Sequence, residues 1–306
     1  MRPTLVTGAA GSVGAVGRTV VGLLRARGLP VRAFVRRDDQ RAAALRATGA
    51  EVVVGDLTRA ADVARALAGC RGLYFGMGVS SQYLEAALTT AAVARDYGEL
   101  EIFANMSQMT VSQMDLTSTS ESSQQRRHWL VEQVLDWSGL PVTHLRPTIF
   151  MENPLFAAFV YASIARDGTI RLPFGSGRTS PIAARDVAEV VATILADPAP
   201  HLGRTYHLTG PASRDLTRLA QEFSAALGRP VTYVDVEYEP WKERELRALG
   251  LPGTVFEHLA TMARLHADNR YDRLTDDVRD IIGRAPTGVP EFVADNPDLF
   301  PPPRQD

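Results

Sequence analysis

The chain has 306 residues, of which 45% are hydrophobic, and its formal net charge is −2. This length allows one large core with a smaller second lobe, and the near-neutral charge gives no electrostatic footprint for nucleic acid or an anionic membrane. The one cysteine, Cys70, cannot form an internal disulfide, and no apolar run approaches the ~20 residues of a membrane span. We therefore expect a soluble cytoplasmic protein that binds neither nucleic acid nor a membrane; the sequence leaves its oligomeric state open.

A glycine-rich segment follows a predicted strand at Pro3–Thr7 and precedes a predicted helix at Val16–Arg27. A tight turn between a strand and a helix presents backbone N–H groups and the positive end of the helix dipole, which together cradle phosphate. The segment therefore predicts a site for a dinucleotide diphosphate. The residues expected to contact it are Gly8, Ala10, Gly11, Ser12, Val13 and Gly14.

Strand-length apolar runs then alternate with helical stretches through the first half of the chain. Further strands are predicted at Val31–Val35, Glu51–Val54, Leu73–Phe75, Glu101–Met106 and Val142–Arg146, with helices at Gln40–Ala47, Val63–Leu67, Leu84–Tyr97 and His128–Trp137. This alternation predicts a parallel sheet with helices on both faces, which is a doubly wound (Rossmann) α/β fold. The polar stretch at 115–123 is either a lid over the crevice or a solvated connector.

The second half of the chain is patterned more loosely. Helices are predicted at Leu155–Ala165, Ala184–Ala196 and Leu216–Leu227, and strands at Thr169–Pro173, Thr205–Thr209 and Val231–Val236. We assign residues 1–150 to a dinucleotide-binding Rossmann domain and residues 151–300 to a smaller, mainly helical lobe that binds the substrate. The chain is expected to cross back near residues 180–210, and residues 301–306 form a tail.

The ends of the second and third strands indicate which dinucleotide binds. An acid at the end of the second strand would bind ribose hydroxyls, whereas an arginine accommodates the extra phosphate of NADP. Here Arg36 and Arg37 precede the first acid, Asp38. The pattern favours NADP(H) and leaves NAD(H) open; the alternative is that both arginines are merely solvated.

Residues after the third and fourth strands are expected to contact the adenine and the middle of the cofactor. Asp56 and Leu57 offer a carboxylate and a main-chain amide for the adenine, although Asp56 could instead cap the following helix. Gly76 and Met77 follow the fourth strand, where small residues permit close approach of the cofactor.

Several of these segments together resemble the NmrA-like family of atypical short-chain dehydrogenases/reductases. They are Thr7–Gly14, Val31–Arg36, Gly55–Leu57, Ser138–Pro147, Ser180–Val187 and Leu208–Pro211. The resemblance implies an NADPH-dependent reductase of quinones or dyes, or a redox sensor that binds the cofactor without turnover. A reductase or isomerase of a specialised metabolite is a further alternative.

One departure from the family concerns the glycine turn. Ala15, Val16 and Gly17 lengthen it by about three residues, so the diphosphate lies over Gly8, Gly11 and Gly14 or over Gly11, Gly14 and Gly17. Thr7, which closes the strand, favours the first frame.

The catalytic pair of typical short-chain dehydrogenases is a tyrosine with a lysine four residues later on one helix face. The one lysine, Lys242, does follow Tyr238 at this spacing, but Pro240 is predicted to open a helix that excludes Tyr238. At the place where the family's pair belongs, this chain has Gln124 and His128. The resemblance therefore implies direct hydride transfer to an electron-poor acceptor.

His128 is the first candidate for a catalytic residue. It could bind the nicotinamide ribose or supply a proton to a quinone oxygen, and the alternative is a helix histidine that bonds a backbone group. Ser107 and Gln108 are expected to line the same crevice. Cofactor contacts are further expected from Asn105 and Met106 at the end of the fifth strand, from His128, and, by the resemblance, from Pro147, Thr148 and Ile149. The six histidines are scattered, so no metal site is expected.

Overall fold

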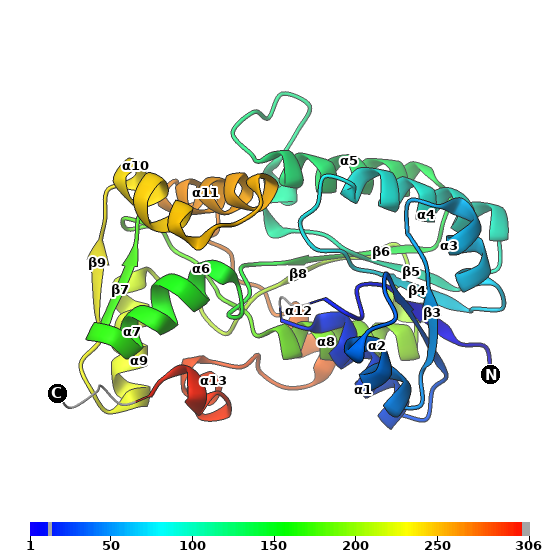
Figure 1. Ribbon diagram of the computed structural model, residues 1–306, viewed down its shortest axis with the longest axis horizontal. Coiled ribbons are helices and arrows are strands. Elements are labelled where there is room, and N and C mark those ends of the chain that lie inside the picture. The colour runs from blue at the N-terminus through cyan, green and yellow to red at the C-terminus, as the bar shows by residue number, and fades with distance from the viewer. Residues whose placement is uncertain (12–13, 302–306) are drawn as a thin grey trace.

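The computed structural model describes residues 1–11 and 14–301. Its centre is a parallel sheet of seven strands in the order β3-β2-β1-β4-β5-β6-β8 (Figure 1). The strands are β1 (Thr4–Val6), β2 (Val31–Val35), β3 (Glu51–Val54), β4 (Gly72–Phe75), β5 (Ile102–Met106), β6 (Val142–Pro147) and β8 (Thr205–Leu208). The strand order reverses between β1 and β4, which is where a doubly wound sheet opens a crevice. The predicted Rossmann fold is confirmed.

Helices cover both faces of this sheet and bury its apolar side chains in two separate cores. One core packs against α1 (Val16–Ala26), α2 (Gln40–Ala47), α8 (Ala184–Ala196) and α12 (Asp277–Ile282). The other packs against α3 (Ala60–Leu67), α4 (Tyr83–Tyr97) and α5 (Ser123–Trp137). Since both faces are covered, strands such as β4 are buried along their whole length.

Helix α5 begins five residues earlier than the apolar pattern predicts. The Ser122 hydroxyl accepts a hydrogen bond from the Gln125 backbone amide, and the Gln125 side-chain oxygen accepts one from the Ser122 backbone amide. This capping box satisfies two backbone donors at the helix start and extends the helix over polar residues. A short 3₁₀ helix, η1 (Met109–Gln113), lies between β5 and α5.

The second lobe has its own core, built around a two-stranded parallel sheet of β7 (Thr169–Leu172) and β9 (Thr232–Asp235). Its other elements are α6 (Pro154–Phe156), η2 (Ala157–Tyr161), α7 (Ala162–Asp167), α9 (Leu216–Leu227), α10 (Tyr238–Pro240), η4 (Trp241–Leu246), η5 (Arg247–Leu249), α11 (Gly253–Ala267), α13 (Val289–Asp295) and η6 (Pro297–Leu299). The short helix η3 (Ala199–His201) lies beside the large sheet instead, where the His201 carbonyl accepts a hydrogen bond from the Thr143 hydroxyl of β6 (2.7 Å). In Figure 1, α11 meets the start of α5, so the two lobes are in contact there. The domain boundaries at residues 150 and 300 remain predictions.

One sequence-based interpretation in this lobe is wrong. Helix α10 begins at Tyr238, after Glu237, and Tyr238 is therefore inside the first turn together with Pro240. A proline in the first helical turn lacks only an N–H that the turn leaves unpaired, so it does not have to be the first residue.

The ends of β1 and β4 approach each other closely at the reversal of strand order. The Thr7 hydroxyl accepts a hydrogen bond from the Gly76 amide (2.9 Å) and donates one to the Gly76 carbonyl (3.0 Å). Gly8 has a φ of +65°, and a Cβ there would lie 2.4 Å from the Gly76 carbonyl oxygen. A Cβ on Gly17, in the first turn of α1, would lie 2.8 Å from the Gly8 carbonyl group. Glycine is therefore required at both positions.

The two proposed frames share Gly11 and Gly14, and only one of them includes Gly8 and only the other Gly17. The structure gives Gly8 and Gly17 different roles. Gly8 makes the tight turn, and Gly17 allows α1 to pack against the strand end, which are the first and third glycine tasks of a dinucleotide-binding turn. Gly11 lies between them and donates its N–H to the Gly8 carbonyl (2.9 Å). Which amides hold the diphosphate remains a prediction.

The substitution Gly8→Ala tests the close approach of β1 and β4. We expect it to lower the free energy of unfolding by about 3 kcal/mol, because it combines a left-handed backbone with a collision against main-chain atoms. The control is Gly28→Ala, where φ is +74° and a Cβ would meet no atom within 4 Å. There the loss should be about 1 kcal/mol. Urea unfolding of both variants measures the difference, and equal losses would mean that the approach is not tight.

Candidate functional site

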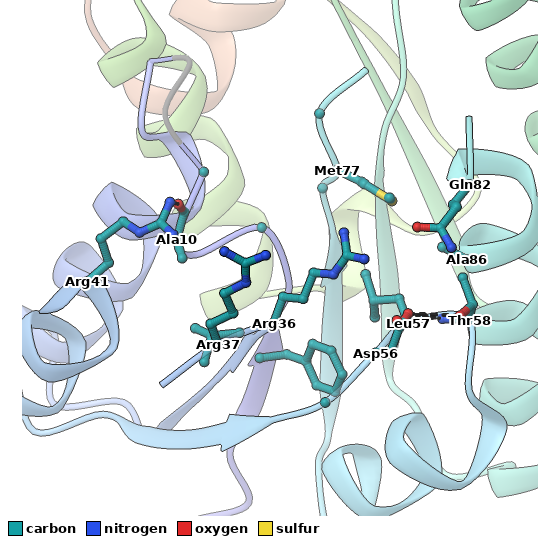
Figure 2. Close-up of a pocket in the computed structure, with 17 residues that line it drawn as sticks. Ala10, Arg36, Arg37, Arg41, Asp56, Leu57, Thr58, Met77, Gln82 and Ala86 are labelled. Carbon is teal, nitrogen blue, oxygen red and sulfur yellow. Dashed lines mark hydrogen bonds between the residues drawn. The ribbon is translucent and has the colours of Figure 1, made fainter. Parts of the chain in front are cut away.

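A cavity of about 360 Å³ opens at the carboxyl edge of the large sheet (Figure 2). This is the edge at which open α/β sheets bind ligands. Its walls come from the ends of β1, β2, β3 and β4 and from the start of α4. The predicted cofactor residues that line it are Gly8, Ala10, Gly11, Arg36, Arg37, Asp56, Leu57, Gly76 and Met77.

Arg36 and Arg37 carry positive charge into this cavity from the end of β2 (Figure 2). Within the described residues, neither guanidinium forms an ion pair. The neighbouring acids are occupied elsewhere: Asp38 pairs with Arg46 (2.7 Å), and Asp39 pairs with Arg41 (2.6 Å) while it caps α2. The arginine hydrogen bonds also hold the pKa of each of these carboxyls below its usual value. The cavity wall is therefore suited to an anion such as a phosphate monoester.

Arg41 is a third arginine in this wall, and our sequence reasoning missed it. It lies in the first turn of α2 and donates a hydrogen bond to the Ala10 carbonyl (3.0 Å), which belongs to the glycine turn. The side chain thus joins the glycine turn to the start of α2. A signal was present in the sequence, because Arg41 follows Arg36 by five residues and a helix start brings it back to the same edge.

Asp56 and Leu57 line the opposite wall, beside Thr58 (Figure 2). One Asp56 oxygen accepts hydrogen bonds from the Thr58 amide (2.9 Å) and hydroxyl (2.8 Å), and these bonds lower the pKa of Asp56. The Asp56 amide donates to Asp62 (3.0 Å). Asp56 thus shapes the turn into α3, and within the described residues its second carboxylate oxygen and the Leu57 amide have no protein partner. The predicted contact of these two groups with an adenine remains a prediction.

His128 lies in α5, with only 5% of its surface exposed. Its Nδ1 is 2.7 Å from the Tyr83 hydroxyl, and its Nε2 is 3.2 Å from the Gln124 amide nitrogen. The Gln124 oxygen accepts from the Ser80 amide (3.3 Å), which directs the Gln124 NH₂ group toward His128. His128 Nε2 is therefore an acceptor and Nδ1 carries the proton. Burial lowers the pKa of His128 to about 3, so the ring is neutral near pH 7.

The residues expected beneath the nicotinamide differ in whether their polar groups already have protein partners. Asn105 is fully buried with its NH₂ group 3.0 Å from His144, whereas the buried Ser107 hydroxyl has no protein partner in the described part of the chain. The Thr148 hydroxyl is bonded to the Ser180 carbonyl (2.5 Å). Among the remaining predicted contacts, Met106 ends β5 and Gln108 follows it, and both are partly exposed. Pro147 ends β6 and Ile149 follows it, and both are buried. Gly14 abuts Ala184, and Ser12 and Val13 lie outside the described residues.

Among residues 1–11 and 14–301, no helix is both long and apolar enough to cross a membrane. The same residues contain no group of three or more histidine, cysteine or acidic side chains arranged to hold a metal ion.

Comparisons with known proteins extend this picture. An NAD(P)H azoreductase of Xenophilus azovorans is 30% identical over 287 residues, which is 92% of this chain and 94% of the relative. A (4-alkanoyl-5-oxo-2,5-dihydrofuran-3-yl)methyl phosphate reductase of Streptomyces griseus is 29% identical over 97% of this chain and 99% of its own length. The structure of an NADPH-dependent quinone oxidoreductase of Escherichia coli, solved with NADPH, has the same fold: its TM-score is 0.82 at 24% identity over 95% of this chain and 99% of that one.

The model of a protein family described as NAD(P)H-binding matches residues 11–198. The match begins inside the glycine turn, covers the ends of β2, β3 and β4 that line the cavity, and ends just after α8. Together with the reductases described above, it confirms the resemblance found in the sequence. The chain belongs to the NAD(P)H-binding family.

Proposed function

We propose that the protein is an NADPH-dependent oxidoreductase that reduces a conjugated small molecule, such as a quinone, without a tyrosine–lysine pair. When bound, the nicotinamide supplies the hydride. The residues of this chain hold the cofactor at the carboxyl edge, orient the acceptor beside it and exclude water. A cytoplasmic location is part of the same proposal.

The observation that carries the proposal is the pair Gln124 and His128, one turn apart on α5. An amide and a buried, neutral imidazole take the positions where an alcohol dehydrogenase needs a proton donor of lowered pKa. A conjugated acceptor delocalises the charge that arrives with the hydride, so its reduction depends less on a strong protein acid. Because Tyr83 and Gln124 occupy both ring nitrogens, we assign His128 a positioning role.

The tyrosine and lysine with the right spacing lie in the second lobe and have other partners. The Tyr238 hydroxyl donates to the Ala260 carbonyl (3.1 Å), and Lys242 pairs with Glu239 (2.7 Å) and Glu243 (3.5 Å). These acids raise the pKa of Lys242, whereas an activating lysine must lower the pKa of its tyrosine from a position beside the substrate. The arrangement supports a structural role for this pair.

The charges around the cavity support NADP(H) over NAD(H). Ribose hydroxyls are recognised by a free carboxylate at the end of β2, but Asp38 and Asp39 are both paired with arginines. The side chains left unpaired there are Arg36 and Arg37, which match the charge of a 2′-phosphate.

A second candidate is a dedicated reductase of a specialised metabolite. It is favoured by the Streptomyces griseus relative, whose substrate is a phosphorylated unsaturated lactone and whose similarity extends over nearly the whole chain. Such a substrate is also conjugated, so both candidates use the same site.

Removal of single arginines tests the cofactor assignment. We expect Arg36→Ala to weaken NADPH binding about 10- to 100-fold, since it removes charge-assisted hydrogen bonds to a phosphate, and to change NADH affinity less than about twofold. Arg41→Ala should weaken both cofactors, because Arg41 also supports the glycine turn. Titration calorimetry measures the affinities, and Arg95→Ala on α4 is the control. Equal weakening of both cofactors by Arg36→Ala would refute the assignment.

A panel of acceptors tests the activity itself. NADPH oxidation is followed with menadione, an azo dye and an unsaturated lactone, and we expect turnover with at least one of them. Variants with Gln124→Ala should retain cofactor affinity and lose turnover about 10-fold through misplaced residues in the crevice. Tight NADPH binding without turnover on any acceptor would instead favour a redox sensor.

A further inference from the structure

A histidine of the second lobe lies at the start of α5, on the side of the sheet where the nicotinamide must extend. His258 is on α11, and its Nδ1 is 2.8 Å from the hydroxyl of Ser122, the residue that caps α5. Ser122 is 1% exposed and His258 5%. The contact therefore joins the two lobes inside the protein rather than on its surface.

The hydrogen bonds of Ser122 determine which ring nitrogen of His258 carries the proton. The Ser122 oxygen accepts from the Gln125 amide (3.2 Å), so its own hydrogen is free to be donated to His258 Nδ1. The opposite assignment would make the Ser122 oxygen accept from both the Gln125 amide and His258 Nδ1, and would leave the Ser122 hydrogen without a protein partner in the described residues. His258 is consequently an Nε2–H donor, and in the described residues no protein acceptor receives that hydrogen.

The fold places this donor beside the acceptor site. Helices of a doubly wound sheet run antiparallel to their strands, so the start of α5 lies at the carboxyl edge. Under the proposed function, the arginine-lined cavity would hold the adenosine half of the cofactor over β1, β2 and β3, and the nicotinamide half would extend over β4, β5 and β6. Ser107, whose hydroxyl has no protein partner in the described residues, directly follows β5 at this same edge.

Neighbouring bonds hold the helix rigidly in this place. Glu257 accepts hydrogen bonds from the amide (3.1 Å) and hydroxyl (3.0 Å) of Ser123, and Arg264 donates to the Ser120 carbonyl. Figure 1 shows α11 meeting the first turn of α5. A donor fixed in this way costs little reorganisation when a substrate binds.

We propose that His258 donates its Nε2–H hydrogen bond to the acceptor substrate, with Ser122 fixing the tautomer, and that it thereby selects acceptors with a conjugated oxygen or nitrogen. This inference rests on the proposed function and names the group that recognises the substrate. In quinone reduction, the hydride brings two electrons and forms the new bond to the quinone. The resulting monoanion keeps its charge on an oxygen that accepts the hydrogen bond from His258, and water then supplies the proton that completes the hydroquinone.

A neutral imidazole suits this task. Burial lowers the pKa of His258 to about 4, so Nε2 keeps one hydrogen and the ring has no charge near pH 7. A hydrogen-bond donor placed where negative charge develops raises the turnover rate by about 100-fold or more.

Two substitutions at the same position separate the donor from the link between helices. The side-chain amide of His258→Asn can reach Ser122 but not the crevice, whereas the longer amide of His258→Gln can place an N–H near the position of Nε2. We expect His258→Asn to lower kcat with menadione about 10- to 100-fold, with NADPH affinity unchanged. His258→Gln should instead retain most of the kcat of the unmodified protein. Glu257→Gln weakens the neighbouring link between α5 and α11 and should leave kcat near that of the unmodified protein.

Binding without NADPH gives a readout that does not depend on turnover. Tryptophan fluorescence reports the affinity for menadione and for 2-methylnaphthalene, which has a similar shape and no oxygen. We expect His258→Asn to weaken menadione binding about 3- to 10-fold and to leave 2-methylnaphthalene binding unchanged.

The outcomes distinguish this inference from the proposed function. If His258→Asn folds and retains both kcat and menadione affinity, or if Glu257→Gln causes the same loss, His258 only joins the helices and the inference is overturned. If the unmodified protein reduces no acceptor but His258→Asn still weakens menadione binding selectively, the proposed function fails and the inference stands. If neither His258 variant folds, Ser122→Ala and Ser122→Thr decide: loss of selective menadione binding in the first and its retention in the second support the inference, and equal affinities overturn it.

Discussion

Where β1 and β4 end, the hydroxyl of Thr7 accepts a hydrogen bond from the backbone N–H of Gly76 and donates one to the Gly76 carbonyl. The chain then turns through Gly8 against the same carbonyl. This contact brings the two strands together where the strand order reverses. It leaves no room for a side chain at position 8, so the backbone itself forms the floor of the cavity. The cofactor site, the position of α1 and the direction of the crevice all depend on this approach.

The electrostatics of the cavity follow from which charges are already paired. Asp38 and Asp39 are each occupied by an arginine of α2, and Arg36 and Arg37 remain without ion-pair partners in the described chain. The number of arginines at this edge therefore does not by itself indicate a phosphate site, because Arg41 and Arg46 neutralise local acids. The unpaired arginines are what an additional phosphate would meet.

Much of the architecture could be predicted because strong apolar runs and glycines mark the strands and turns. Strand β2 and helix α2 begin and end at the predicted residues. The start of α5 was missed because its first turn is polar and held by a capping box between Ser122 and Gln125 rather than by apolar spacing. The start of α10 was wrong because proline tolerates more than one place in a first helical turn.

The site was less accessible to sequence reasoning than the fold, because its important contacts join distant segments. Gln124 and His128 could be placed by spacing, but the partners Tyr83 and Ser80 come from the connection after β4 and the start of α4. Ser122 and His258 are 136 positions apart in the chain, so no local sequence pattern predicts their hydrogen bond. A titratable side chain acquires its protonation state from such contacts. The sequence therefore left three roles open for His128, a ribose contact, a proton donor or a helix histidine bonded to the backbone, and the structure adds that the ring is buried and neutral.

A crystal structure with NADPH tests the central claim most directly. We expect the diphosphate over the turn that begins at Gly8, the 2′-phosphate beside Arg36 and Arg37, and the nicotinamide over the ends of β4 and β5. A cofactor bound in the reverse direction, or bound away from the glycine turn, would contradict the claim.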